Sequence, residues 1–174
     1  LHAEQCLKLY AKQNNHSLTI LRPTNIYGTA TQSFPYSRKT LVPNCFIEEA
    51  INLGTITIKA SSPVYRNFVS IHKIGAAIKY FANSIQQTPS TINLCGSHTY
   101  EIEDIAKIVK VGVQRIINKH VEILTPNRNS ISGINEGFLV TSQVNDKILG
   151  YQEDSIMDSI DDLTEKYYHN FQGA

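Results

Sequence analysis

Apolar residues along the chain follow two spacings, one typical of helices and one typical of buried strands. Where they recur three and four positions apart, they mark one face of a helix. This spacing predicts six helices, at Ala3–Gln13, 41–53, 74–81 and 102–116, in a short segment ending at Gly150, and from Ser155 onward. Short segments rich in apolar residues predict strands at Leu18–Leu21, Ile56–Ile58, Phe68–Ile71, Thr91–Cys95 and Val121–Leu124. Helices and strands therefore alternate, which indicates an α/β fold.

Polar residues and glycines mark the expected ends of these helices. Asn14 and Asn15 should close the first helix, because asparagine tolerates the left-handed conformation found just past helix ends. Gly54 should end the second in the same way. Thr99 is expected to cap the start of the helix at 102–116, and Ser155 the start of the last helix.

The number of predicted strands is small for the fold that they indicate. A parallel sheet needs helices on both faces, and two or three buried strands are too few to form one alone. The chain also begins with Leu1 rather than methionine. Both observations predict that residues 1–174 are one portion of a longer protein.

Composition excludes several classes of protein. The chain has 174 residues, 41% apolar and 18% charged, which favours a folded domain over disorder. Its formal net charge is +1 and its basic residues are scattered, so a nucleic-acid partner is not expected. No apolar run reaches the roughly 18 residues of a membrane span. Three separated cysteines and six dispersed histidines predict no disulfide framework and no metal site, and favour a cytoplasmic location.

Candidate chemistry follows the first predicted strand. Ligands of open α/β sheets bind at the carboxyl ends of strands, where Arg22, Asn25 and Tyr27 are placed. The alternative is a simple turn in which Asn25 bonds only to backbone. Spacing alone leaves both interpretations open.

Five segments, in order, resemble one known family. Residues 21–28 (LRPTNIYG) look like its LRxxNxYG segment, and residues 65–73 (YRNFVSIHK) look like xRDFVHVDD. Residues 92–97 (INLCGS) resemble YNIGSG, and residues 147–151 (KILGY) resemble xxLLGW or xxLLGY. Residues 1–5 (LHAEQ) resemble the stretch after the catalytic Lys of YxxxK. The chain thus resembles the C-terminal, substrate-binding part of an extended short-chain dehydrogenase/reductase of the nucleotide-sugar epimerase and dehydratase family.

This resemblance implies both a fold and an activity. The fold would comprise the last strands and helices of a Rossmann-like doubly wound sheet, plus a small mixed α/β substrate-binding domain. The whole protein would be an NAD- or NADP-dependent epimerase, dehydratase or 4-keto reductase of nucleotide-sugars, in polysaccharide biosynthesis. It would form a homodimer, and the chain itself is expected to associate as a dimer or larger through its first helix or an exposed strand edge. The glycine-rich pyrophosphate turn and the catalytic Tyr and Lys do not occur in these 174 residues, so the isolated chain is expected neither to bind the dinucleotide nor to catalyse.

The resemblance also assigns roles to particular residues. Pro23 would lie against the nicotinamide, and Asn25 would bond the sugar or phosphate of a nucleotide-sugar. Arg66 would pair with the diphosphate, with Arg128 as a possible second contact. The nucleotide base would be flanked by Leu41, Val42 and Lys59. No residue of the chain is assigned a catalytic role or a metal.

Three departures from the family pattern keep other functions open. Asn67 replaces an Asp that could orient Arg66, Thr141 replaces another Asp, and His72-Lys73 replaces an acidic pair. A Lys is unfavourable at the start of a helix. These changes favour a non-catalytic relative, acting as a ligand sensor or interaction module. A third possibility, an oxidoreductase of non-nucleotide substrates, is disfavoured by Arg66, since such substrates carry no diphosphate.

Overall fold

A computed structural model describes residues 2–28, 41–84, 90–126, 140–144, 146–152 and 155–172. Its helices are α1 (His2–Gln13), α2 (Val42–Leu53), α3 (Ile71–Ala82), α4 (Ile102–Ile117), α5 (Asp146–Leu149) and α6 (Ile156–Gln172). Its strands are β1 (Thr19–Pro23), β2 (Asn25–Tyr27), β3 (Thr55–Thr57), β4 (Tyr65–Ser70), β5 (Ser90–Leu94), β6 (Thr99–Glu101) and β7 (Glu122–Leu124). The predicted α/β class is confirmed.

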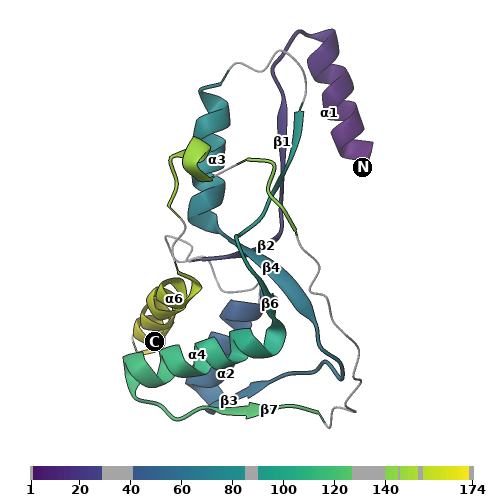
Figure 1. Cartoon of the computed structure of the whole chain (residues 1–174). Helices are drawn as coiled ribbons and strands as arrows, with labels where there is room; N and C mark the ends of the chain where they lie inside the picture. Colours follow the sequence, from purple (N-terminus) through teal and green to yellow (C-terminus); the bar gives the residue numbers. More distant parts are fainter. Residues whose placement is uncertain are drawn as a thin grey trace.

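The strands form three small sheets rather than one. β1 pairs with β5 and β3 pairs with β7, both in parallel, while β4 lies between parallel β2 and antiparallel β6. In Figure 1 the β1–β5 pair and α3 occupy one end of the molecule, and the β3–β7 pair with α2, α4 and α6 the other. The three-stranded sheet connects the two ends.

This three-stranded sheet separates two hydrophobic cores. Successive side chains of a strand point to opposite faces of its sheet. Tyr27 and Phe68 belong to the larger core with α2, α4 and α6, whereas Val69 and Ile26 pack in the smaller core beside α3 and α5. β2 and β4 therefore contribute side chains to both cores. The same alternation decides which face of the sheet each of their polar side chains occupies.

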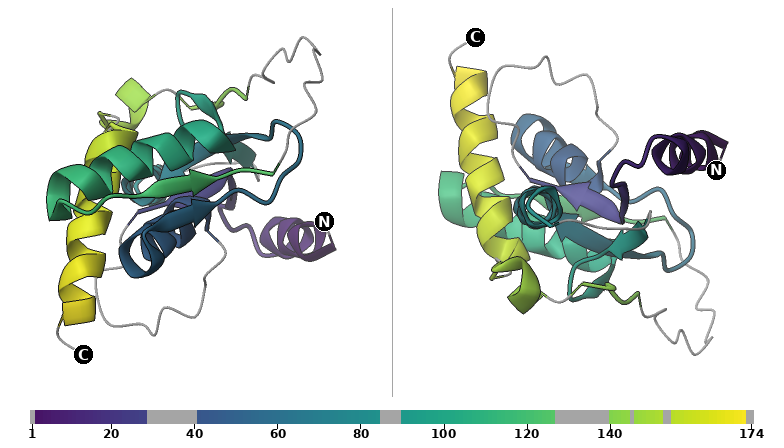
Figure 2. Two further views of the ribbon diagram at one scale, coloured as in Figure 1. Left: turned by 90° about the horizontal axis from the view of Figure 1, so that it is seen from below. Right: turned by 90° about the horizontal axis from the view of Figure 1, so that it is seen from above.

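The larger core is built from three helices that cross one another, as both views of Figure 2 show for α4 and α6. Ile47 on α2, Val109 on α4 and Ile160 on α6 are completely buried. In the sequence, these residues belong to the apolar positions that recur three and four residues apart. Burying each such side chain contributes about 1.5–3 kcal/mol, which makes this core the main source of stability at that end.

Three of the predicted helix ends are confirmed. Asn15, with φ of 54°, and Gly54, with φ of 71°, adopt the left-handed conformation just after α1 and α2. Ser155 precedes α6, and its Oγ accepts a hydrogen bond from the Met157 amide at 3.2 Å. The Thr99 prediction is wrong. Thr99 lies in β6 opposite Asn67, and Glu101 holds the N-cap position of α4 without a side-chain cap.

Two strands were not predicted, and a third begins earlier than expected. β2 forms where the sequence suggested only a turn, and β6 where it suggested a helix cap. β4 begins at Tyr65 rather than Phe68, while Ile71 starts α3. Both missed strands pair with β4 over three residues, which is too short for an alternating pattern to stand out in the sequence.

The expectation that Lys73 sits unfavourably at a helix start is also wrong. Ser70 caps α3 instead, because its Oγ accepts a hydrogen bond from the Lys73 amide at 3.1 Å. The Lys73 side chain is 3% exposed, and its Nζ lies 2.6 Å from Asp146 Oδ1 at the start of α5. The ammonium charge is thus neutralised by another element, and it ties α5 to α3.

Replacing Gly28 with alanine should destabilise the protein by about 2–4 kcal/mol. Gly28 has a φ of +131°, and an added Cβ would lie 2.6 Å from Ile71 Cγ2. Gly75→Ala is the matched control, because nothing lies within 4 Å of its added Cβ and it sits inside α3. That change should stabilise by about 0.5–1 kcal/mol. Urea unfolding of both variants measures the difference, and equal effects would contradict the account.

No helix among the described residues is long and apolar enough to cross a membrane.

Candidate functional site

The candidate site begins where β1 ends and the chain passes into a second sheet. Pro23 is the last residue of β1 and pairs with Leu94, whose carbonyl accepts a hydrogen bond from the Thr24 amide at 3.0 Å. Asn25 then opens β2. Pro23 is exposed, so the surface beside it at the carboxyl end of the parallel pair is accessible to a ligand.

Arg22, a polar residue of the same segment, points elsewhere. Its guanidinium forms an ion pair with Glu4 of α1. The hydrogen bond from Arg22 holds the pKa of the Glu4 carboxyl below its ordinary value. Arg22 therefore links β1 to α1 and is not a residue of the site.

Asn25 is exposed and bonds to backbone. Its Nδ2 donates to the Asn67 carbonyl oxygen at 3.0 Å, so the side chain bonds to backbone, as the turn interpretation predicted. The turn itself is wrong, because Asn25 lies in a strand paired with β4. The hydrogen bond fixes the side chain at the surface of the sheet.

Arg66 lies on the same face of this sheet as Asn25. Asn25 pairs with Phe68 across β2 and β4, and Arg66 is two residues before Phe68 on β4. Strand rise and spacing then put the Cα atoms of Asn25 and Arg66 about 8 Å apart. The Arg66 side chain is exposed, and its Nη1 donates to the Tyr65 carbonyl at 3.0 Å. The structure thus brings together two of the residues that the family resemblance assigned to a nucleotide-sugar.

Asn67 does not act on Arg66, which corrects the interpretation of its replacement of Asp. It points to the opposite face and is 2% exposed. Its Oδ1 accepts from Thr24 Oγ1 at 2.8 Å and from the Gly96 amide at 2.9 Å. Its Nδ2 donates to the carbonyls of Gly96 at 2.9 Å and His98 at 3.0 Å. All four hydrogen-bonding positions of the amide are used, so Asn67 joins β4 to the β5–β6 loop.

The other predicted residues lie on different elements. Leu41, 37% exposed, holds the N-cap position of α2, and half-buried Val42 packs against the larger core. Lys59 is exposed just after β3, the strand on which α2 packs. Thr141 is exposed as well. Arg128 lies outside the described residues.

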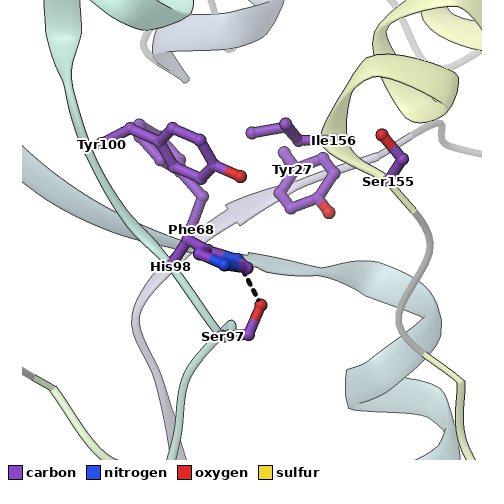
Figure 3. A pocket seen from close by; sticks show the side chains of 7 residues that line it. All are labelled: Tyr27, Phe68, Ser97, His98, Tyr100, Ser155 and Ile156. Atoms are coloured by element: carbon purple, nitrogen blue, oxygen red, sulfur yellow. Dashed lines mark hydrogen bonds between the residues drawn. The ribbon is translucent and has the colours of Figure 1, made fainter.

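A pocket of about 300 Å³ opens beside this face of the sheet and was not predicted. Figure 3 shows its side chains, which come from β2, β4, β6, the β5–β6 loop and the start of α6. They are Tyr27, Phe68, Ser97, His98, Tyr100, Ser155 and Ile156. Tyr27, one of the residues that the sequence placed at the ligand-binding end of a strand, lines it, whereas Asn25 and Arg66 do not. The only sequence signal for this pocket is the presence of aromatic residues at these positions. The strand register is needed to show that Tyr27, Phe68 and Tyr100 share a face.

The described residues do not indicate a metal site or a reactive thiol. No group of three or more His, Cys, Asp or Glu side chains in the described ranges is arranged to hold a metal ion. Burial raises the pKa of the Cys45 thiol, and the neighbouring Glu49 carboxylate raises it further. Such a thiol is a weak nucleophile at neutral pH.

Comparison with known proteins gives no match to any family model or curated protein, but many to solved structures. UDP-glucose 4-epimerase of Thermotoga maritima with UDP-glucose is 18% identical, with a TM-score of 0.70 over 97% of this chain and 51% of that one. The UDP-glucose-4-epimerase of Stenotrophomonas maltophila, with NAD and formylated UDP-arabinopyranose, is 13% identical, with a TM-score of 0.67 over 98% and 53%. The chain has the nucleotide-sugar epimerase fold.

A further solved structure shares this fold. RMD of Pseudomonas aeruginosa, solved with NADPH, is 11% identical, with a TM-score of 0.65 over 97% of this chain and 53% of that one. The chain spans about half the length of the solved structures that it matches. At these identities the likeness establishes the fold, and it confirms the Rossmann-like α/β architecture implied by the five sequence segments.

Proposed function

We propose that this chain is the substrate-binding portion of an NAD- or NADP-dependent enzyme acting on nucleotide-sugars, as an epimerase, dehydratase or 4-keto reductase. One observation carries the proposal: the exposed side chains of Asn25 and Arg66 lie on the same face of the three-stranded sheet, in a chain with the nucleotide-sugar epimerase fold. The dinucleotide-binding portion would lie outside these 174 residues. The whole protein would be cytoplasmic, with no nucleic-acid or membrane partner.

In this proposal, the chain binds and orients the substrate. The planar guanidinium of Arg66 would donate paired hydrogen bonds to the diphosphate, a geometry that lysine cannot reproduce. Asn25 would donate to the phosphate or sugar from a position fixed by its contact with β4. The dinucleotide would supply the hydride acceptor or donor, with its nicotinamide beside exposed Pro23. Leu41, Val42 and Lys59 would flank the base, and Arg128 could add a second diphosphate contact.

The structure weakens the main argument for a non-catalytic sensor. That argument rested on Asn67, His72-Lys73 and Thr141, which depart from the family pattern. Asn67 has four hydrogen bonds and Lys73 has its own carboxylate partner. Because both residues are built into the fold, their identity does not indicate a lost activity.

Arg66→Ala, in the protein that carries this sequence in full, should weaken nucleotide-sugar binding by about ten- to a hundredfold. The reason is the loss of the charge-assisted contact between Arg66 and the diphosphate, worth about 1.5–3 kcal/mol. Affinity for NAD or NADP should remain unchanged. Calorimetric titration with UDP-glucose measures the effect.

Arg115→Ala is the control for this titration, since exposed Arg115 pairs with Asp161 near the opposite end of the molecule. It should bind the nucleotide-sugar like the unaltered protein. Arg66→Lys should recover only part of the affinity. If Arg66→Ala weakened the nucleotide-sugar and the dinucleotide equally, Arg66 would have a structural role instead.

We also propose that the protein forms a homodimer through α1. Leu7, Leu9 and Tyr10 of this helix are 51%, 61% and 59% exposed, and Figures 1 and 2 show α1 at the edge of the molecule. Leu7→Glu should convert the dimer to a monomer, because a charge in an apolar interface is costly. Leu53→Glu, at a 70% exposed site on α2, should not. Light scattering at several concentrations measures the oligomeric state of the unaltered protein and of both variants. A monomeric unaltered protein would contradict the proposal.

A further inference from the structure

We infer that the pocket between the three-stranded sheet, the β5–β6 loop and α6 binds a small, neutral, fused-ring molecule. This site adjoins the surface that carries Asn25 and Arg66, on the same face of the sheet, but neither of these residues lines it. The inference rests on the size of the pocket, the aromatic character of its walls and the kinds of polar group at its mouth. It does not depend on the proposed function.

The volume limits the size of the occupant. At about 300 Å³, the pocket stands at the lower end of the range for small-molecule sites, which is about 300–1,000 Å³. A cavity of about 150 Å³ accommodates one benzene ring. Twice that volume suits two fused rings, and it excludes a complete nucleotide-sugar.

The walls are aromatic and deeply placed. Tyr27 and Phe68 are each 3% exposed, and half-buried Tyr100 extends the same sheet face. Figure 3 shows Phe68 and Tyr100 together on one side, with Tyr27 facing them across the pocket. Flat aromatic surfaces favour a planar ring, because offset or edge-to-face contacts between rings add to the gain from burial.

The mouth of the pocket is polar but carries no fixed charge. Ser97, His98 and Ser155 are exposed, and Ser97 Oγ lies 2.6 Å from His98 Nδ1. No lining side chain is an Asp, Glu, Lys or Arg. Burying an ion without a countercharge is costly, so the favoured ligand is neutral with a few polar atoms on its edge.

The pocket and the nucleotide-sugar surface are neighbours with different residues. Tyr100 pairs with Arg66, and Phe68 pairs with Asn25, across adjacent strands. Neither Asn25 nor Arg66 lines the pocket. Its opposite side is Ile156, in the first turn of α6. A bound ring would therefore contact both the sheet and the start of this helix.

Indole is a suitable probe, because the chain contains no tryptophan, whose fluorescence would coincide with that of the probe. Titration should give saturable binding with Kd below about 1 mM. Ile156→Phe, which adds a ring to the pocket, should weaken indole binding at least tenfold. The matched control is Ile148→Phe, at a 57% exposed site on α5, which should bind as before.

Further variants and ligands test whether indole binds in this pocket and whether the pocket favours neutral molecules. Indole-3-carboxylate should bind at least tenfold more weakly than indole, and Arg66→Ala should leave indole binding unchanged. If Ile156→Phe fails to fold, His98→Ala replaces it, because this side chain is exposed, and at least a threefold loss is expected. The inference is overturned by non-saturable binding, by full binding in the pocket variant, by equal affinity for the carboxylate, or by loss of indole binding in Arg66→Ala.

Discussion

Asn67→Asp should destabilise the protein by about 2–5 kcal/mol at neutral pH. The substitution keeps the shape of the side chain but removes both N–H donors. The Gly96 and His98 carbonyls that Asn67 now satisfies would then face a carboxylate oxygen. Each buried acceptor left without a donor costs about 1–3 kcal/mol. The Thr24 hydroxyl and the Gly96 amide still donate to the other oxygen, which offsets part of this cost.

The effect of this substitution should depend on pH in a defined direction. Burial and the two carbonyls would raise the pKa of the introduced carboxyl above the value of about 3.9 in the unfolded chain. A group with a raised folded-state pKa loses its stabilising contribution as pH rises. Urea unfolding should therefore show a small deficit near pH 4 that grows toward pH 7. Asn93→Asp, at an exposed site, should stay within about 0.5 kcal/mol, and a pH-independent deficit would contradict the account.

Asp146→Asn should cost about 3–5 kcal/mol, because it leaves the Lys73 ammonium buried without a countercharge. The two partners differ in exposure, at 3% for Lys73 and 29% for Asp146. The reciprocal change, Lys73→Met, should therefore cost less, about 2–3 kcal/mol, since water can reach the remaining carboxylate. The double variant should recover much of the loss, as a buried methionine needs no partner.

A double-mutant cycle by urea unfolding measures this coupling. The control pair is Lys166 and Asp162 on α6, whose side chains are each 50% exposed and 2.7 Å apart. Exposed pairs of this kind contribute about 0.3–0.5 kcal/mol, so Asp162→Asn should have little effect. Equal costs for Asp146→Asn and Asp162→Asn would show that burial of Lys73 does not determine the energy.

The sequence predicted the features that depend on local spacing. Apolar periodicity located the helices that carry Ile47, Val109 and Ile160, while Asn15 and Gly54 marked the ends of α1 and α2. These signals lie within a few residues of the element that they describe. The five resembling segments then indicated the fold, which the solved structures confirm.

Features that join distant parts of the chain were not predictable from spacing. Thr99 looked like a helix cap, because nothing local reveals its antiparallel pairing with Asn67. Lys73 looked unfavourable at a helix start, because Asp146 is far away in the sequence. The pocket combines residues from Tyr27 to Ile156. In each case the deciding contact forms only when the strands and helices have packed.

The most direct test of the proposed function is a crystal structure of the protein that carries this sequence in full, with a bound nucleotide-sugar. We expect the diphosphate oxygens to lie within hydrogen-bonding distance of the Arg66 guanidinium, with Asn25 contacting the phosphate or sugar. The nucleotide-sugar would then lie beside the exposed side chains of Asn25 on β2 and Arg66 on β4. A nucleotide-sugar bound elsewhere, with Arg66 and Asn25 both in solvent, would contradict the central claim.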